Sequence, residues 1–189
     1  LPAHRDRPRE YSCHVHSSGA AGATFAHVRT TIVRNAIFVG LAVSVYGVSF
    51  GAIGITAGLS VTQTCALSIL MFTGASQLAF VGVIGAGGAP ATAIATALLL
   101  GVRNAMYAVR MSTVLRVRGG WKLLAAQLTI DESTALSIAQ DEAIEEGRAS
   151  RLGFWAGGLS VFVLWNTATL IGALSAQAIG DPKAFGLDT

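Results

Sequence analysis

The sequence has very little charge, and the charge is absent from two long stretches. Only 12% of the 189 residues are Asp, Glu, Lys or Arg, about half the share found in a typical soluble domain. None of these residues occurs between positions 35 and 102 or between positions 152 and 180. Apolar runs of about 18 residues or more predict transmembrane helices. The sequence therefore excludes an ordinary soluble domain.

Cysteine and histidine are also scarce. The two cysteines, Cys13 and Cys65, lie in a polar and an apolar segment respectively, so they predict no disulfide framework. Cys13, His14 and His16 form a short cluster without a further group that would complete four ligands, so we expect no metal and no cofactor. The net charge of +3 comes without a basic stripe that carries interleaved aromatic residues. This pattern argues against nucleic acid as a partner.

The chain divides into a polar N-terminal part and an apolar remainder. Residues 1–34 are rich in Arg, His, Ser and Gly without periodicity, which predicts a mobile tail. Residues 35–189 predict one all-α polytopic membrane domain with the bilayer as a partner. About five membrane segments are expected, near residues 37–57, 64–87, 91–115, 123–140 and 153–179. Residues 35–58 are too long for the apolar part of a signal peptide, so the first helix is expected to be retained.

Two of these segments, 64–87 and 123–140, are expected to be broken or re-entrant. Basic residues before the first helix and after the third helix both indicate the cytoplasmic side: Arg29, Arg34, Arg110, Arg116, Arg118 and Lys122. Three full crossings would put these two groups on opposite sides, whereas a hairpin at residues 64–87 makes them agree. Irregular backbone at membrane depth needs shielding by protein or a cavity. We therefore favour the hairpin, with a cytoplasmic N-terminus, and the full crossing stays the alternative.

Polar residues recur at similar depth in the apolar segments. With a rise of about 1.5 Å per residue, the stretch from Thr73 to Gln77 lies near the middle of a membrane core about 30 Å thick. Polar groups at comparable depth occur in other segments: Arg103 and Asn104, Asp131 and Glu132, and Asn166. The recurrence predicts a common polar site inside the membrane.

Most of these polar points also have a packing interpretation. Thr73, Gly74 and Ser76 are compatible with ordinary helix packing, and Asn166 with a hydrogen bond between helices. Gln77 is harder to explain by packing, because its amide carries donors and an acceptor that all need partners.

Asp131 and Glu132 are the sharpest functional candidates. Acidic residues within a membrane usually mark proton or substrate paths; the alternative is a surface amphipathic helix over residues 123–140 with both acids in water. Burial favours the neutral form of a carboxyl group, whereas a nearby arginine favours the charged form. A carboxylate between these influences can take up and release a proton. Arg103 is the expected counter-charge, unless its long side chain reaches the interface instead.

Six stretches of the sequence resemble a known family. They are FGAIGITAGLS (50–60), MFTGASQLAFVGVIGAG (71–87), LLLGVRNAMYAVRMS (98–112), LTIDESTALSIAQ (128–140), GFWAGGLSVFVLWNTATLIGAL (153–174) and DPKAFGLD (181–188). In this order and spacing, residues 35–189 resemble the AzlC-like branched-chain amino acid permeases.

The resemblance implies the large subunit of a two-component exporter of leucine, isoleucine and valine. It further implies a small AzlD-type membrane subunit as partner, a location in the cell membrane, and further helices after residue 189, so we expect a C-terminally truncated chain. The family's motifs fall on Gly74, Ala75, Ser76 and Gln77, on Arg103, Asn104 and Tyr107, and on Asp131, Glu132 and Ser133. Asn104 stands where many members have His, which argues against a proton relay at that position.

A zwitterionic amino acid needs donors for its carboxylate, acceptors for its ammonium group and an apolar pocket for its side chain. The carboxylate is expected at the amides of residues 74–77 and at Arg103, and the side chain against Phe72, Leu78 and Phe80. The predicted substrate-binding residues are Gly74, Ser76, Gln77, Arg103, Asn104, Tyr107 and Asn166. Asp131 and Glu132 are predicted to accept the ammonium group or to couple transport to protons.

Two other functions stay open at this point. One is a channel, or a transporter for another small solute. The other, less favoured, is an intramembrane aspartyl protease that uses Asp131 and Asp181. A serine protease based on Ser76 is excluded, because no histidine follows His27 to serve as its base. We therefore predict a transporter rather than an enzyme.

Overall fold

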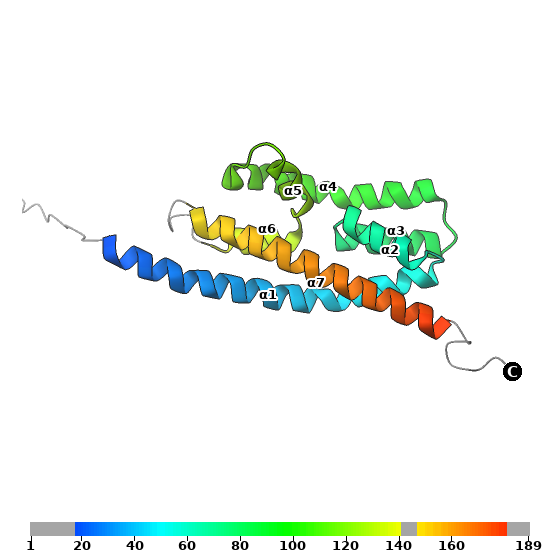
Figure 1. The fold of residues 1–189 in the computed structure, drawn as a ribbon. Helices are drawn as coiled ribbons and strands as arrows, with labels where there is room; N and C mark the ends of the chain where they lie inside the picture. Colours follow the sequence, from blue (N-terminus) through cyan, green and yellow to red (C-terminus); the bar gives the residue numbers. More distant parts are fainter. Residues whose placement is uncertain (1–17, 141–146, 181–189) are drawn as a thin grey trace, which may run out of the picture.

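The computed structural model describes residues 18–140 and 147–180, with side chains from residue 28 onward. It has three long helices, α1 (Ser18–Thr56), α4 (Pro90–Leu115) and α7 (Arg148–Gly180) (Figure 1). Between them lie two pairs of short helices, α2 (Val61–Leu70) with α3 (Gly74–Gly85), and α5 (Trp121–Gln127) with α6 (Asp131–Ile138). The described residues contain no strand. The predicted all-α fold of about five segments is confirmed.

Within the described ranges, three helical stretches are long and apolar enough to cross a membrane: Val28–Thr56, Pro90–Leu115 and Arg148–Gly180. The bounds of α4 match the expected 91–115, because Pro90 opens the helix at a position where its missing N–H is not needed. The predicted start of the first helix near residue 37 was too late. Hydropathy marks only the part of a helix that suits lipid, and α1 continues outward through polar residues to Ser18.

Residues 18–34, which the sequence placed in a mobile tail, are therefore part of α1. Residues 148–151 form the first turn of α7. The remainder of the predicted tail with Cys13, His14 and His16, and the DPKAFGLD motif with Asp181, lie outside the described residues.

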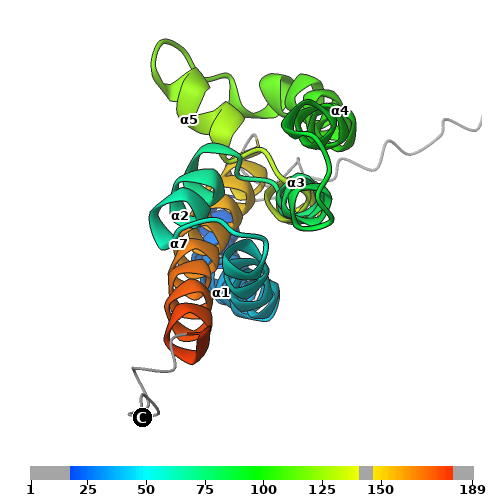
Figure 2. The same ribbon diagram turned by 90° about the vertical axis from the view of Figure 1, so that its right-hand side faces the viewer.

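Helices α1 and α7 lie side by side and run parallel (Figures 1 and 2). The Ser160 hydroxyl donates a hydrogen bond of 2.7 Å to the Ala36 carbonyl, and further along Gly47 lies against Trp165 and Ala168. At Gly51 and Gly172 the two backbones meet, since a Cβ on either glycine would overlap the carbonyl oxygen of the other helix. Glycine at these positions allows the close approach that membrane helices use for packing.

This contact predicts a stability effect for Gly172→Ala. The added methyl group would overlap the Val48 carbonyl, so the two helices must separate. We expect the free energy of unfolding in detergent to fall by about 1–3 kcal/mol, measured as a lower midpoint of thermal unfolding. Gly82→Ala is the matched control, because a Cβ at Gly82 meets no atom within 4 Å. Equal midpoints for the two variants would contradict the close α1–α7 contact.

Helices α2 and α3 form a broken hairpin. α2 begins with a capping box: the backbone N–H of Gln63 donates to the Ser60 hydroxyl, and the side-chain oxygen of Gln63 accepts from the backbone N–H of Ser60. The helix ends at Leu70, and α3 starts at Gly74. A Cβ on Gly85, at the end of α3, would lie 3.2 Å from the Ala57 Cβ just after α1. The chain therefore leaves the hairpin at the end of the bundle where it entered, as the hairpin interpretation predicts.

Helices α5 and α6 form a second broken hairpin, at the opposite end of the bundle (Figure 1). α6 packs along the first half of α7, where Gly153 and Gly157 contact Leu136. Gly158 contacts Leu128 in the break before α6. The end of α4 and the start of α7 share one pocket, lined by residues that include Arg116 and Gly147. A single amphipathic surface helix over residues 123–140 is therefore wrong, because Leu128, Thr129 and Ile130 interrupt the helix and are buried.

Candidate functional site

The tips of the two hairpins meet in the middle of the bundle. The Gln127 side-chain amide, at the end of α5, donates a hydrogen bond of 2.6 Å to the Ile69 carbonyl, near the end of α2. Beside this contact lies a cavity of about 90 Å³. It is lined by Val43, Phe72, Thr73, Gly74, Ala75, Arg103, Ile130, Asp131, Glu132, Val161 and Trp165. The cavity thus lies where both helix pairs are broken.

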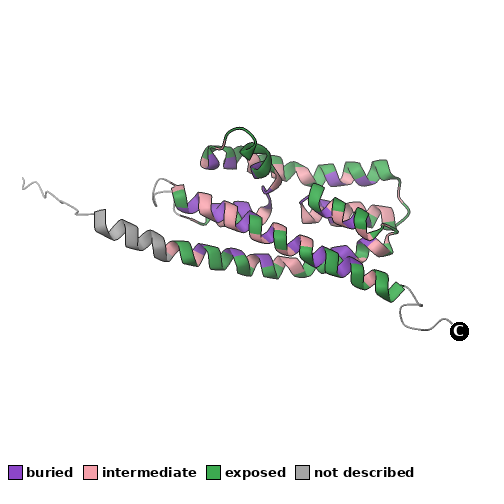
Figure 3. Cartoon of the chain, in the orientation of Figure 1, coloured by how far each residue is buried: buried purple, intermediate pink, exposed green. Residues whose placement is uncertain are grey.

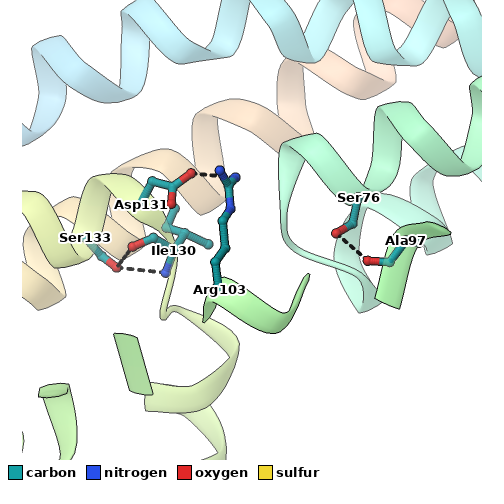
Figure 4. A network of polar contacts seen from close by, with 6 residues as sticks. All are labelled: Ser76, Ala97, Arg103, Ile130, Asp131 and Ser133. Carbon is teal, nitrogen blue, oxygen red and sulfur yellow. Dashed lines mark hydrogen bonds and ion pairs between the residues drawn. The ribbon is translucent and has the colours of Figure 1, made fainter. Parts of the chain in front are cut away.

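An ion pair lies at the cavity. The Arg103 guanidinium on α4 lies 2.7 Å from the Asp131 carboxylate at the start of α6 (Figure 4). Both side chains are a little less than half exposed, at 44% and 42%. The second oxygen of Asp131, Oδ1, is out of solvent and has no hydrogen-bond partner among the described residues. The expected pairing of Arg103 with Asp131 is present, and Arg103 does not extend away to an interface.

The two hairpin breaks present helix N-termini to this cavity. α3 begins at Gly74 without a side-chain cap from Thr73 and without an acidic residue in its first turn. α6 begins with the two acids, and the Ser133 hydroxyl accepts from the Ile130 amide (Figure 4). The same hydroxyl donates to the Leu128 carbonyl. The N-terminus of a helix favours negative charge. The α3 side of the cavity therefore suits an anionic group, while the α6 side supplies carboxylates.

The rest of the cavity wall is apolar. Val43 comes from α1, Phe72 from the first hairpin break, and Val161 and Trp165 from α7. Phe72 also packs edge-on against Phe162, with ring centroids 4.9 Å apart. The lining of the cavity thus combines groups of both charge signs with aliphatic and aromatic carbon.

Two predicted site residues do not face the cavity, because their polar groups are used elsewhere. The Ser76 hydroxyl donates 2.8 Å to the Ala97 carbonyl of α4, and Ser76 is 1% exposed (Figure 4). Gln77 is fully buried and bonded to Ser68, Met71 and Trp165. The packing interpretation therefore fits Ser76, and Gln77 has protein partners for all the groups that made it hard to explain.

Three further predicted residues, Tyr107, Asn166 and Asn104, are not among those that line the cavity. Tyr107 lies close to the Asp131 carboxylate, about one turn beyond Arg103 on α4. The Asn166 amide donates to the Phe162 carbonyl of its own helix. Asn104 Oδ1 is buried without a partner among the described residues. Leu78 and Phe80, expected in the side-chain pocket, pack against the core instead.

Sequence reasoning missed Trp165, Val43 and Val161. Trp165 is 4% exposed, and its indole N–H donates 3.0 Å to the Gln77 side-chain oxygen. A tryptophan in the middle of an apolar span needs a partner for this N–H, and that need is the signal that could have identified it. The two valines gave no signal, because they are typical of any apolar helix.

Broken helices that meet at a polar site between long apolar helices are the arrangement typical of membrane transporters. A long helix followed by a broken hairpin and a second long helix occurs here twice. The first copy runs from α1 to α4, and the second runs in the opposite direction from α4 to α7. The family model described as AzlC protein matches residues 39–179. The chain belongs to the AzlC family, a family of membrane transporters. No curated protein and no solved structure matches it.

Proposed function

We propose that this protein is the large subunit of a proton-coupled exporter of branched-chain amino acids, in the cell membrane, with a small AzlD-type subunit as its partner. Membership of the AzlC family supports amino acid transport. The central cavity supports the choice of substrate, because its three kinds of surface correspond to the three parts of an aliphatic amino acid.

The observation that carries the proposal is the ion pair between Arg103 and Asp131 at this cavity. A zwitterion can replace the pair: its carboxylate binds Arg103 and the N-terminus of α3, and its ammonium group binds Asp131. Each protein charge then exchanges one partner for another, so neither is left without one when the pair opens. A substrate with only one charge would leave the opposite protein charge unpaired, which is unfavourable in a partly buried site.

The size of the cavity supports a movement of the hairpin tips during transport. About 90 Å³ is well below the roughly 300–1,000 Å³ of typical ligand pockets, so an amino acid fits only after the tips separate. Because the hairpins come from opposite ends of the bundle, movement of one tip at a time would open the cavity to one side at a time.

The distribution of basic residues supports a cytoplasmic N-terminus. Arg29 and Arg34 of α1 lie at the same end of the bundle as the start of α7, since α1 and α7 are parallel and in register. The end of α4, with Arg116, lies at this end as well. Basic residues collect on the cytoplasmic side of membrane proteins.

Exposed apolar residues support a membrane location and leave room for a second subunit. α4 shows mainly exposed residues (Figure 3). Several large side chains of α4 are more than half exposed: Leu98, Leu99, Val102, Met106 and Val109. This surface suits contact with lipid or with the apolar surface of a small membrane subunit.

Counterflow of labelled leucine in vesicles tests the proposed substrate. The protein is reconstituted with its small subunit, and unlabelled compounds are added as competitors. We expect leucine, isoleucine and valine to compete. We expect 4-methylpentanoate, which lacks the ammonium group, and 3-methylbutylamine, which lacks the carboxylate, to be at least about tenfold weaker, because each loses a hydrogen bond to a charged group.

The same experiment separates the alternatives. A channel gives no counterflow of labelled leucine. A transporter for another solute gives no leucine counterflow that branched-chain amino acids inhibit. Equal competition by the amine or the acid would contradict the role of the ion pair.

A further inference from the structure

We propose that Trp165 forms the wall of the cavity that selects the substrate's side chain, and that Gln77 is the positioning residue that holds this wall in place. The inference rests on the proposed transport of amino acids through the central cavity. It gives Gln77 a role other than the substrate contact expected from the sequence.

Every polar group of the Gln77 side chain is used within the protein. Its amide nitrogen lies 3.1 Å from the Ser68 carbonyl and 2.7 Å from the Met71 carbonyl, to both of which it donates. These carbonyls belong to the end of α2, where a helix leaves carbonyl groups without partners. The amide oxygen accepts from the Trp165 indole at 3.0 Å. One side chain therefore fixes both the hairpin break and the orientation of the indole ring.

The Trp165 ring is held on its other sides as well. It stacks on Phe50, with ring centroids 6.4 Å apart. On another side it reaches the hairpin break, since a Cβ built on Gly74 would lie 3.1 Å from the ring. A ring held by Gln77, Phe50 and Gly74 is a fixed part of the cavity wall.

This wall lies among the apolar lining residues, where an aliphatic side chain would bind. The charged groups Arg103, Asp131 and Glu132 orient the two ends of the zwitterion, so its side chain is left to contact Val43, Val161 and Trp165. One methylene group more or less in an apolar pocket changes discrimination between substrates by about 10- to 200-fold. The position of a single large ring can therefore decide which side chain is accepted.

The test compares side-chain selectivity in wild-type and variant transporters. The measured quantity is the ratio of phenylalanine to valine as competitors of leucine counterflow. Trp165→Phe removes ring volume and the indole N–H, and we expect the ratio to move at least about tenfold towards phenylalanine. Gln77→Met keeps the length of the side chain but loses its hydrogen bonds, and we expect a shift in the same direction.

Additivity shows whether Gln77 acts through Trp165. The double variant is expected to shift the ratio no further than Trp165→Phe does, because residues that act as a unit are not additive. Gln77→Glu is expected to restore most of the wild-type ratio, because a protonated carboxyl group can still accept from the indole and donate to one carbonyl. Trp155→Phe is the matched control: Trp155 is also on α7 but packs against Trp121 and Phe154.

The outcomes separate the inference from the function on which it rests. If wild-type vesicles show no leucine counterflow, the proposed function fails and the inference fails with it. If wild type transports leucine and Trp165→Phe leaves the ratio unchanged, only the inference is overturned. A purely structural role of Gln77 would lower transport of all substrates equally in Gln77→Met. If Gln77→Met does not accumulate in the membrane, Gln77→Glu provides the test instead. A competitor ratio in Gln77→Glu that is shifted as far as in Trp165→Phe would overturn the positioning role.

Discussion

Arg103→Gln is expected to lower leucine counterflow by about 30-fold or more without loss of protein from the membrane. Arg103 is paired with Asp131 at 2.7 Å and, in the proposed mechanism, with the substrate carboxylate. The pair is only partly buried, and the loss of a hydrogen bond to a charged group costs about 1.5–3 kcal/mol. Each 1.4 kcal/mol is a factor of ten in affinity. Initial rates of counterflow, normalised to the amount of reconstituted protein, measure the effect.

Arg110→Gln is the matched control for this experiment. Arg110 lies about two turns further along α4 and lines a separate pocket with Arg116 and Arg151, so we expect near-normal counterflow. Arg103→Gln with more than about a third of the wild-type rate would contradict a role of Arg103 in substrate binding.

The double variant Arg103→Gln/Asp131→Asn separates a structural ion pair from a binding site. It removes both charges of the pair, so neither is left without its partner. If the pair only stabilises the fold, the double variant regains the activity that the single variant loses. If the pair binds the two ends of the substrate, the double variant stays inactive, which is the result we expect.

Glu132→Gln is expected to uncouple transport from protons. Glu132 lines the same cavity as Asp131, and both are half-buried at the first turn of α6. Because Asp131 is occupied by Arg103 in this structure, Glu132 is the better candidate for the carboxyl group that carries the proton. A glutamine has nearly the same shape but cannot release a proton.

Two assays on the same vesicles test this role. Leucine exchange without a pH gradient needs no net proton movement, so we expect Glu132→Gln to retain it within about threefold. Net leucine movement driven by a pH gradient is expected to fall at least about tenfold, since a variant that carries no proton gains no driving force from the gradient. Asp131→Asn should lose both activities. Gradient-driven transport at the wild-type level in Glu132→Gln would exclude Glu132 as the proton carrier.

The sequence predicted most of the fold because membrane segments are visible in composition. α4 was placed almost correctly, since proline and glycine mark its start and its apolar residues are continuous. The start of α1 at Ser18 was not predictable in the same way, because a helix that leaves the lipid region can continue through polar residues. A break within residues 64–87 was anticipated from topology rather than from propensity, and the structure places it before Gly74.

The charged half of the site was predictable for a related reason. Arg103 and Asp131 stand out within segments otherwise suited to lipid, so sequence alone could pair them as counter-charges. The role of Gln77 was not predictable. Its partners are main-chain carbonyls at the end of another helix and an indole 88 residues further along the chain, and a sequence pattern does not encode which way a buried amide points.

The parallel packing of α1 against α7 has a consequence for how the protein is assembled during synthesis. The hydrogen bond from Ser160 to the Ala36 carbonyl joins residues 124 positions apart. α1 therefore enters the membrane long before α7 is synthesised. Its glycine-lined surface has no partner while both hairpins are made. Non-local contacts of this kind form late, so insertion of α7 is the step that closes the bundle. Chains arrested before α7 would present an incomplete interface to the quality-control proteases of the membrane.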